Sequence, residues 1–260
     1  EIYTLSLHDA LPICQVMAGR DSRDMTTLPD YFEVQHDVSK NLRIGIIRET
    51  MTDDVDTDVR AAVNNYADAL RAAGHTVEMV AMPSIKHALA IYYIVVPAEI
   101  SSNLARYDGV RYGRRAEGVK TLAELYGRSR GEGFVTENKR RIMIGSYVLS
   151  SGFFDAYYLQ AQKARTVLIN EFNALFEQYD FLLMPTAPTP AFGIGENTDD
   201  PVKMYLADVM TVPPSLAGLP ALSVPAGVNA RGLPIGAQLV GRAKSDAALI
   251  ALAGSMEARA

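Results

Sequence analysis

Alternating strand and helix patterns in the first third of the chain constrain its fold more than any other feature. Residues 42–49, LRIGIIRE, form an apolar run with polar ends, which indicates a buried strand. Acidic residues at 53–58 then supply caps for a helix over Val55–Ala73, whose apolar residues recur at helical spacing. Gly74 ends that helix, and Thr76–Met82 has the pattern of a second strand. Strand, helix and strand in this order are typical of an α/β layer fold.

The rest of the chain continues the same alternation of elements. Helices are predicted from Pro83 through the 90s, over Thr136–Leu149, over Ala156–Tyr179 and from Asp246. Strands are predicted over Phe181–Thr186, Ala221–Gly227 and Gly236–Gly241, and the basic segment Arg106–Arg115 is predicted to be a loop. Because no repeat, linker or low-complexity tract interrupts the order, we expect one continuous α/β domain.

Composition excludes several classes of protein. The 260 residues are 48% hydrophobic and 21% charged, which is typical of a globular chain. The net charge of −5 argues against direct binding of nucleic acid through phosphate contacts. One cysteine excludes a disulfide framework and a cysteine-based zinc site. The sequence has no run of 18 uninterrupted apolar residues, so it predicts no membrane span. We therefore expect a cytoplasmic protein without a membrane partner.

The first residues have the character of a cloning artefact. EIYTLSLHDALPI, residues 1–13, lacks the basic start and the cleavage site of a signal peptide. A DNA run that resembles a common sequencing-library adapter encodes this peptide, and Cys14 follows directly. We therefore predict that residues 1–14 are a non-native, adapter-encoded segment and that the coding sequence was cut at its front.

Two apparent motifs do not support a site. Asp54, Asp56 and Asp58 imitate a calcium loop, but Val59 stands at the sixth position in place of glycine, and the twelfth position lacks a glutamate. We therefore expect no metal site there. Ser150 and Ser151 could offer a nucleophile, but they lie between two predicted helices, where small residues are an ordinary break.

Three segments together resemble the amidase signature family. They are AEISSNLARYDGVRYG (Ala98–Gly113), Lys139–Arg165 with KRRIMIG at its start, and Met184–Gly241 with its Pro- and Gly-rich motifs. The first two are most similar to the amidase subunit of tRNA-dependent amidotransferases. The resemblance implies a mixed, twisted sheet flanked by helices on both faces and truncated at its N-terminal side. It also implies that residues 15–260 are the C-terminal part of a single amidase domain.

The family hydrolyses amides with a serine nucleophile that a second serine and a lysine activate. The Gly/Ser-rich segment that carries those serines does not occur in this sequence. We therefore assign no catalytic residue to the chain and expect the lysine and both serines in a missing N-terminal half. The chain alone is predicted to be inactive.

The resemblance implies a glutamine-binding wall formed by Arg141, Asp208 and Tyr92. Glutamine is a zwitterion, and the planar fork of an arginine suits its carboxylate. By resemblance, Arg141 binds the carboxylate and Asp208 the ammonium, while Tyr92, in preference to Tyr93, lines the pocket. We expect the charged ends of Arg141 and Asp208 to face one cleft.

The same resemblance implies partners rather than cofactors for this chain. Ammonia released from glutamine would pass to partner subunits B and C, which hold the misacylated Glu-tRNA(Gln) or Asp-tRNA(Asn), and the partner would use ATP and Mg²⁺. Two alternatives stay open from the sequence. One is a stand-alone amidase that acts on a small amide, and the other is a non-catalytic α/β module that binds an amino acid.

Overall fold

The structure is a computed structural model that describes residues 7–28, 41–196 and 201–257, with side chains described from residue 12 on and not at 201–203. The chain divides into two compact units. Unit 1 comprises the residues up to Lys86 and those from Leu168 on, and unit 2 comprises His87–Val167. The expectation that residues 15–260 belong to a single domain stays a prediction.

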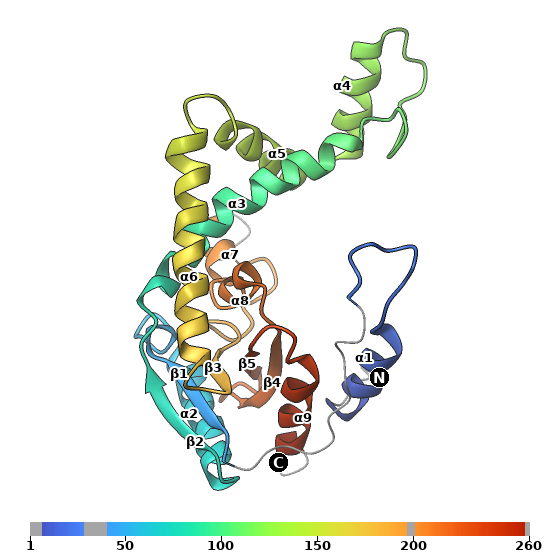
Figure 1. Ribbon diagram of the computed structural model, residues 1–260. Helices are drawn as coiled ribbons and strands as arrows, with labels where there is room; N and C mark the ends of the chain where they lie inside the picture. Colours follow the sequence, from blue (N-terminus) through green and yellow to red (C-terminus); the bar gives the residue numbers. More distant parts are fainter. Residues whose placement is uncertain (1–6, 29–40, 197–200, 258–260) are drawn as a thin grey trace. The chain divides into compact units, whose positions relative to one another are not determined.

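Unit 1 contains a five-stranded mixed sheet with the strand order β2-β1-β3-β5-β4 (Figure 1). Strand β1 pairs in parallel with β2 and β3, whereas β5 pairs antiparallel with β3 and β4. The predicted fold class, a mixed sheet flanked by helices, is confirmed. The strands are β1 (Arg43–Ile47), β2 (Thr76–Val80), β3 (Phe181–Pro185), β4 (Ala221–Val228) and β5 (Pro234–Gly241).

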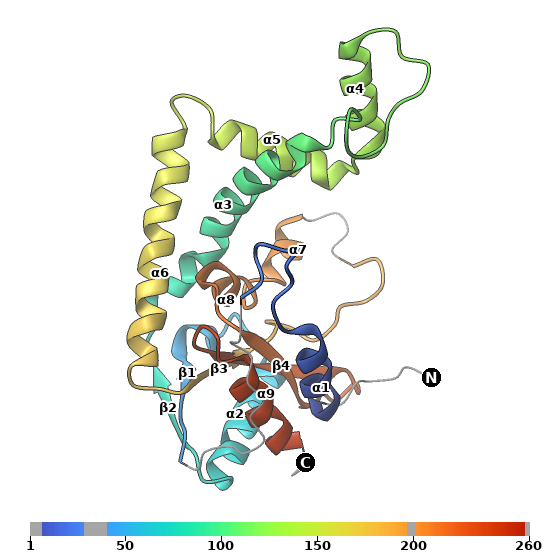
Figure 2. The same cartoon turned by 45° about the vertical axis from the view of Figure 1, so that its right-hand side comes forward.

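Alternation along the strands divides the core between the two faces of the sheet. Ile44, Ile46, Phe181 and Leu183 belong to a cluster that also contains buried residues of α2 (Thr57–Ala72) and α9 (Asp246–Glu257). Figure 2 shows α2 and α9 together on one side of the sheet. On β3, the intervening Leu182 and Met184 are fully buried, as is Phe172 in the unit 1 part of α6 (Gln160–Phe176).

Short elements complete unit 1. Helix α1 lies beside α9, and its Ile13, Val16 and Met17 are exposed. The side chains of Leu5, Leu7 and Leu11 lie outside the described residues, so the foreign origin of residues 1–14 stays a prediction. These elements are α1 (Leu7–Met17), α7 (Pro201–Leu206), α8 (Val212–Ala217) and the 3-10 helices Arg48–Thr50 and Pro83–His87.

Unit 2 is helical, and its close packing depends on one glycine. Helices α3 (Ala88–Asn103) and α5 (Thr136–Val148) pack against each other. A Cβ atom at Gly145 on α5 would overlap with the carbonyl group of Pro97 on α3. Because that group is backbone, a side-chain rotation cannot relieve the overlap. The two helices therefore approach as closely as they do because position 145 has no side chain.

Helix α4 (Leu122–Gly133) was not predicted, because its three glycines weaken the helical pattern. Its start is nevertheless signalled by a capping box. The Glu124 amide donates to Oγ1 of Thr121 (3.2 Å), and the Lys120 amide donates to Oε2 of Glu124 (2.8 Å). The predicted helix Ala156–Tyr179 instead begins as a π-helical turn, Phe154–Leu159, that leads into α6.

Length and composition alone would allow the helical stretch Pro83–Arg106 to cross a membrane. The core helix of a soluble protein can have the same character. Ile91, Val95 and Ala98 of α3 are buried, and α5 packs on this helix. Packing within unit 2 thus buries one side of α3, and 28% of the apolar window of the stretch is buried.

Gly145→Ala is expected to destabilise the protein by about 1–3 kcal/mol, the usual cost of overpacking. The matched control is Gly131→Ala, because a Cβ at this position in α4 meets no atom within 4 Å. There the gain in helix propensity should leave the stability unchanged or raise it by up to about 1 kcal/mol. Urea unfolding followed by circular dichroism measures both, and equal effects would contradict the proposed close contact.

Tyr66 on α2 packs against the unit 1 core with a buried hydroxyl group that has no hydrogen-bond partner among the described residues. Burial raises its pKa to about 12. The unfolded chain, with a pKa near 10, therefore releases this proton first. The part of the unfolding free energy that depends on protonation of Tyr66 is therefore fully present below about pH 10. It is lost as the pH rises towards 12.

Tyr66→Phe should therefore leave the unfolding free energy at pH 7 unchanged or higher, because it removes a buried hydroxyl without a partner. The variant should also lose less stability than the parent between pH 9 and 11. Tyr126→Phe is the control, since Tyr126 is 38% exposed. Parallel stability curves for the parent and Tyr66→Phe would refute this account.

Candidate functional site

Arg141 lies on α5, one helical turn after Glu137. Its Nε donates to Oε1 of Glu137 at 2.9 Å, and its side chain is only 23% exposed. The spacing of four residues places both side chains on the same face of the helix, with the acidic residue nearer the N-terminus. The hydrogen bond that Arg141 donates to Glu137 raises the pKa of Arg141 above its ordinary value, and a further hydrogen bond to Tyr92 adds to this shift. Arg141 is therefore a fixed cation.

Tyr92 reaches the same guanidinium group from α3. Nη1 of Arg141 lies 3.4 Å from the Tyr92 hydroxyl, which accepts the hydrogen bond. The ring of Tyr93 packs edge-on against the ring of Tyr92, with 5.2 Å between centroids. The structure thus brings together two of the three residues predicted to bind glutamine. Their role in binding stays a prediction.

Asp208 lies in unit 1, in the turn between α7 and α8, and its side chain is exposed. Its main-chain carbonyl accepts hydrogen bonds from the amides of Thr211 (3.1 Å) and Val212 (3.2 Å), which fixes the turn at the start of α8. Because Arg141 belongs to unit 2, the cleft that the two residues are predicted to share stays a prediction.

Gln238 on β5 fixes the other side of this turn. Its Nε2 donates to the carbonyl of Met210 at 2.9 Å, and the side chain is only 4% exposed. Sequence reasoning treated the GAQLVG segment as an ordinary strand and missed this contact. The available signal was a glutamine within an otherwise apolar strand, since a buried polar side chain needs a partner.

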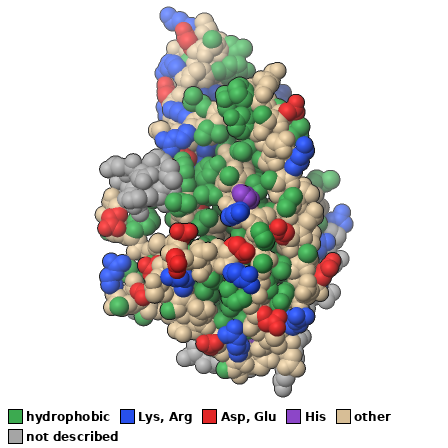
Figure 3. All heavy atoms as spheres, turned by 90° about the vertical axis from the view of Figure 1, so that its left-hand side faces the viewer, with side chains coloured by type: hydrophobic (Ala, Val, Ile, Leu, Met, Phe, Trp, Pro, Cys, Tyr) green, Lys and Arg blue, Asp and Glu red, His purple; other side chains and the backbone are tan. Residues whose placement is uncertain are grey.

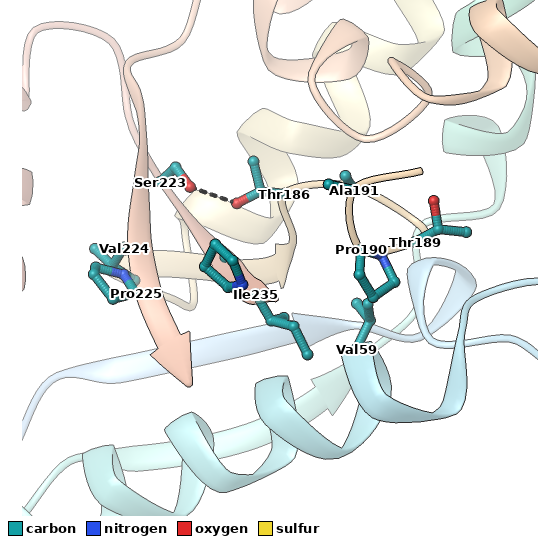
Figure 4. A pocket seen from close by; sticks show the side chains of 12 residues that line it. Val59, Thr186, Thr189, Pro190, Ala191, Ser223, Val224, Pro225 and Ile235 are labelled. Atoms are coloured by element: carbon teal, nitrogen blue, oxygen red, sulfur yellow. Dashed lines mark hydrogen bonds between the residues drawn. The ribbon is translucent and has the colours of Figure 1, made fainter. Parts of the chain in front are cut away.

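A cavity of about 410 Å³ lies at the carboxyl end of β3, between that strand's loop and the β4–β5 hairpin (Figure 4). Thr186 follows β3 directly, and its Oγ1 lies 2.8 Å from Oγ of Ser223 on β4. A Cβ at Gly236 would come within 2.9 Å of both hydroxyl oxygens. Glycine at 236, in the segment predicted as a strand, therefore leaves room for the two hydroxyls to meet.

The cavity has hydroxyl groups but no acid or base. Thr189 is a third hydroxyl-bearing lining residue, and the others are apolar side chains and prolines, including Val59 of α2 and Ile235 of β5. A hydroxyl needs a base or a lowered pKa to become a nucleophile. This cavity can therefore hold part of a small neutral ligand, but its own lining does not provide an activated nucleophile.

Ser150 does not supply that nucleophile in the described structure either. Its Oγ donates to the carbonyl of Tyr147 at 2.7 Å, as expected of a residue that ends a helix. Among the described residues, no group of three or more His, Cys, Asp or Glu side chains could hold a metal ion.

Acidic and basic side chains are interspersed over the lower half of the face in Figure 3. Exposed ion pairs of the described residues include Arg43–Glu78 (3.6 Å) and Arg71–Asp68 (2.6 Å). This part of the face therefore does not form the continuous basic stripe that binds a phosphate backbone.

Comparison with known proteins gives consistent matches. A family model described as Amidase matches residues 2–250. Two curated proteins, each named as the A subunit of glutamyl-tRNA(Gln) amidotransferase, are similar to the chain. The one from Granulibacter bethesdensis is 49% identical over 98% of this chain and 52% of its own length. The one from Brevibacillus brevis is 47% identical over 98% of this chain and 53% of its own length.

Solved structures agree with this result. The crystal structure of the corresponding glutamyl-tRNA(Gln) amidotransferase protein from Thermotoga maritima aligns with a TM-score of 0.73 and 33% identity, over 95% of this chain and 50% of that one. A 6-aminohexanoate cyclic dimer hydrolase aligns with a TM-score of 0.74 over 98% of this chain and 53% of that one, but at 22% identity it shows a common fold alone. The chain spans about half the length of the curated relatives it matches.

Gln238→Leu is expected to lower the free energy of unfolding by about 1–3 kcal/mol, because the Met210 carbonyl loses its buried partner. The control is Gln178→Leu, since Gln178 is exposed at the end of α6. Thermal unfolding of the two variants measures the difference. If Gln238→Leu unfolds at the same temperature as Gln178→Leu, the hydrogen bond does not fix the Asp208 turn.

Proposed function

The chain belongs to the amidase family, and we propose that in a full-length protein it forms the glutamine-binding part of an amidotransferase. In this proposal the full-length protein hydrolyses the side-chain amide of glutamine and releases ammonia. The ammonia is then used to convert a misacylated Glu-tRNA(Gln) or Asp-tRNA(Asn) into the correctly charged form.

The observation that carries the proposal is the environment of Arg141. A half-buried guanidinium group, held by Glu137 and Tyr92, is suited to grip a carboxylate through two parallel hydrogen bonds. Lysine could not replace it, because an ammonium group lacks the planar fork. We assign the α-carboxylate of glutamine to Arg141 and its α-ammonium group to Asp208.

Tyr92 has a steric role in this proposal. Its hydroxyl contacts Arg141, and its ring packs against Tyr93, so the aromatic pair would form an apolar wall beside the carboxylate. Such a wall limits access of water to the ion pair and strengthens it.

We place the serine nucleophile, the second serine and the lysine outside these 260 residues. Two observations support this assignment. The cavity at the end of β3 has no titratable lining group, and the chain covers about half of the related amidotransferase proteins. The chain would then supply recognition, and the remainder of the protein the chemistry.

Partner subunits B and C complete the proposed enzyme, and the partner uses ATP and Mg²⁺ and holds the tRNA. The net charge of −5 and the mixed charges in Figure 3 fit a protein that does not itself bind the tRNA backbone. This division of roles also places the protein in the cytoplasm, where tRNA charging takes place.

In the full-length protein that carries this sequence, Arg141→Ala should lower kcat/KM for glutamine by about 10- to 150-fold. This range corresponds to about 1.5–3 kcal/mol for a hydrogen bond to a charged group. Release of ammonia from glutamine is the measurement. Arg128→Ala is the matched control, since Arg128 also pairs with a glutamate one turn away, here Glu132 at 3.2 Å.

The same assay separates the proposal from its alternatives. Ammonia release that depends on the partner subunits and on tRNA supports an amidotransferase, whereas release without either indicates a stand-alone amidase. Binding of glutamine without turnover in the full-length complex would indicate a non-catalytic module. An unchanged kcat/KM in Arg141→Ala would refute the assignment of Arg141.

A further inference from the structure

We propose that Glu137 is a positioning residue that holds the guanidinium group of Arg141 in the orientation required to grip the α-carboxylate of the substrate. The inference rests on the proposed function, because it presumes that Arg141 binds a carboxylate. It adds a residue to which neither the sequence motifs nor the comparisons gave a role.

The geometry divides the guanidinium group into an occupied part and a part that is available for a ligand. Glu137 takes the N–H of Nε, and the Tyr92 hydroxyl takes one N–H of Nη1. A guanidinium group has five N–H groups, so three remain, all of them on Nη1 and Nη2. Two parallel N–H groups are what a bidentate carboxylate needs. The contacts with Glu137 and Tyr92 therefore leave the end of the fork for a ligand.

The carboxylate of Glu137 is itself held in place from a second side. Its Oε1 accepts from Arg141, while its Oε2 accepts from Nη1 of Arg140 at 2.5 Å. With one arginine on each oxygen, rotation of the carboxylate would break both contacts. Glu137 is thus a fixed support for Arg141.

Charge balance shows why this support does not abolish binding of an anion. The single negative charge of Glu137 is shared between two arginines, Arg140 and Arg141, so it does not neutralise Arg141 alone. An aspartate or glutamate that neutralised Arg141 alone would compete with the substrate. The second arginine removes that conflict.

The energetic reason for such a support is pre-organisation. A free arginine side chain has four rotatable bonds, and ordering it when the substrate binds reduces the affinity. At 23% exposure and with two partners, the Arg141 side chain is already ordered in the absence of a ligand. Loss of Glu137 should therefore weaken binding of the carboxylate while leaving the charge of Arg141 intact.

A merely structural role for Glu137 is the competing explanation. Glu137 lies in the first turn of α5, where an acidic side chain stabilises the helix dipole. Glu137→Asp separates the two roles. It keeps the negative charge at the helix start but is one methylene too short to maintain the contact with Nε of Arg141.

The experiment uses the full-length protein that carries this sequence, assembled with its partner subunits. The KM for glutamine is measured together with the inhibition constant of glutaminamide, in which a neutral amide replaces the α-carboxylate. The variants are Glu137→Gln, Glu137→Asp and Arg141→Ala. Glu132→Gln is the matched control, because Glu132 also bridges two arginines, Arg114 (3.1 Å) and Arg128 (3.2 Å).

We expect both Glu137 variants to raise the KM for glutamine by roughly three- to tenfold, the effect of having to order one flexible side chain when the substrate binds. The inhibition constant of glutaminamide should stay unchanged, because this compound has no carboxylate for Arg141. Glu132→Gln should alter neither value. A KM that stays at the parent value in both Glu137 variants overturns the inference.

Two other outcomes also decide the question. In the first, the KM for glutamine and the inhibition constant of glutaminamide rise equally. In the second, Glu137→Asp has a normal KM and Glu137→Gln a raised KM. Either outcome would indicate a structural role and overturn the inference. If Arg141→Ala raises the KM for glutamine and the Glu137 variants do not, only the role of Glu137 fails. If Arg141→Ala itself leaves the KM unchanged, the proposed function fails first.

Discussion

Unit 1 depends on the complete burial of strand β3. All five residues from Phe181 to Pro185 are buried, and the strand pairs in parallel with β1 on one side and antiparallel with β5 on the other. A strand without a solvent-facing side can accept only apolar side chains. A shift of the pairing register by one residue would move the side chains of each face to the opposite face. The register of β3 therefore fixes the surrounding structure. It pairs Met184 with Gln238, and it places Thr186 opposite Ser223 at the mouth of the cavity.

Unit 2 depends on a different constraint, the close approach of two helices at Gly145. The bare backbone at this position lets α5 lie directly against α3, and the same two helices carry Arg141 and Tyr92. The contact between these side chains is thus a consequence of helix packing one turn away. Spacing within α5 then supplies Glu137. Packing and sequence spacing together determine the surroundings of the arginine.

The sequence predicted those features that local patterns determine. Strands β1, β2 and β3 and helices α2 and α5 were predicted to within two residues at most ends, because apolar periodicity and caps mark them. Helix α4 was missed, because its glycines obscured a capping box at Thr121 and Glu124 that the sequence does contain. Tertiary contacts were beyond prediction from local patterns. The hydrogen bond from Gln238 to Met210 joins residues 28 positions apart. Glu137 was not named by the motif match. Its effect on Arg141 depends on the direction of its side chain, which residue spacing does not determine.

The placement of charge explains why we assign recognition rather than catalysis to this chain. The cavity at the end of β3 has three hydroxyl-bearing lining residues and a backbone that is open at Gly236, but no lining group that could remove a proton. The guanidinium group of Arg141 is held by a carboxylate and a phenol, and such a group stays protonated near neutral pH. Fixed charge and shape select a substrate, whereas bond cleavage needs a group that can change its protonation state. A protein built on this chain therefore needs its acid and base from residues beyond those that line the cavity and hold Arg141.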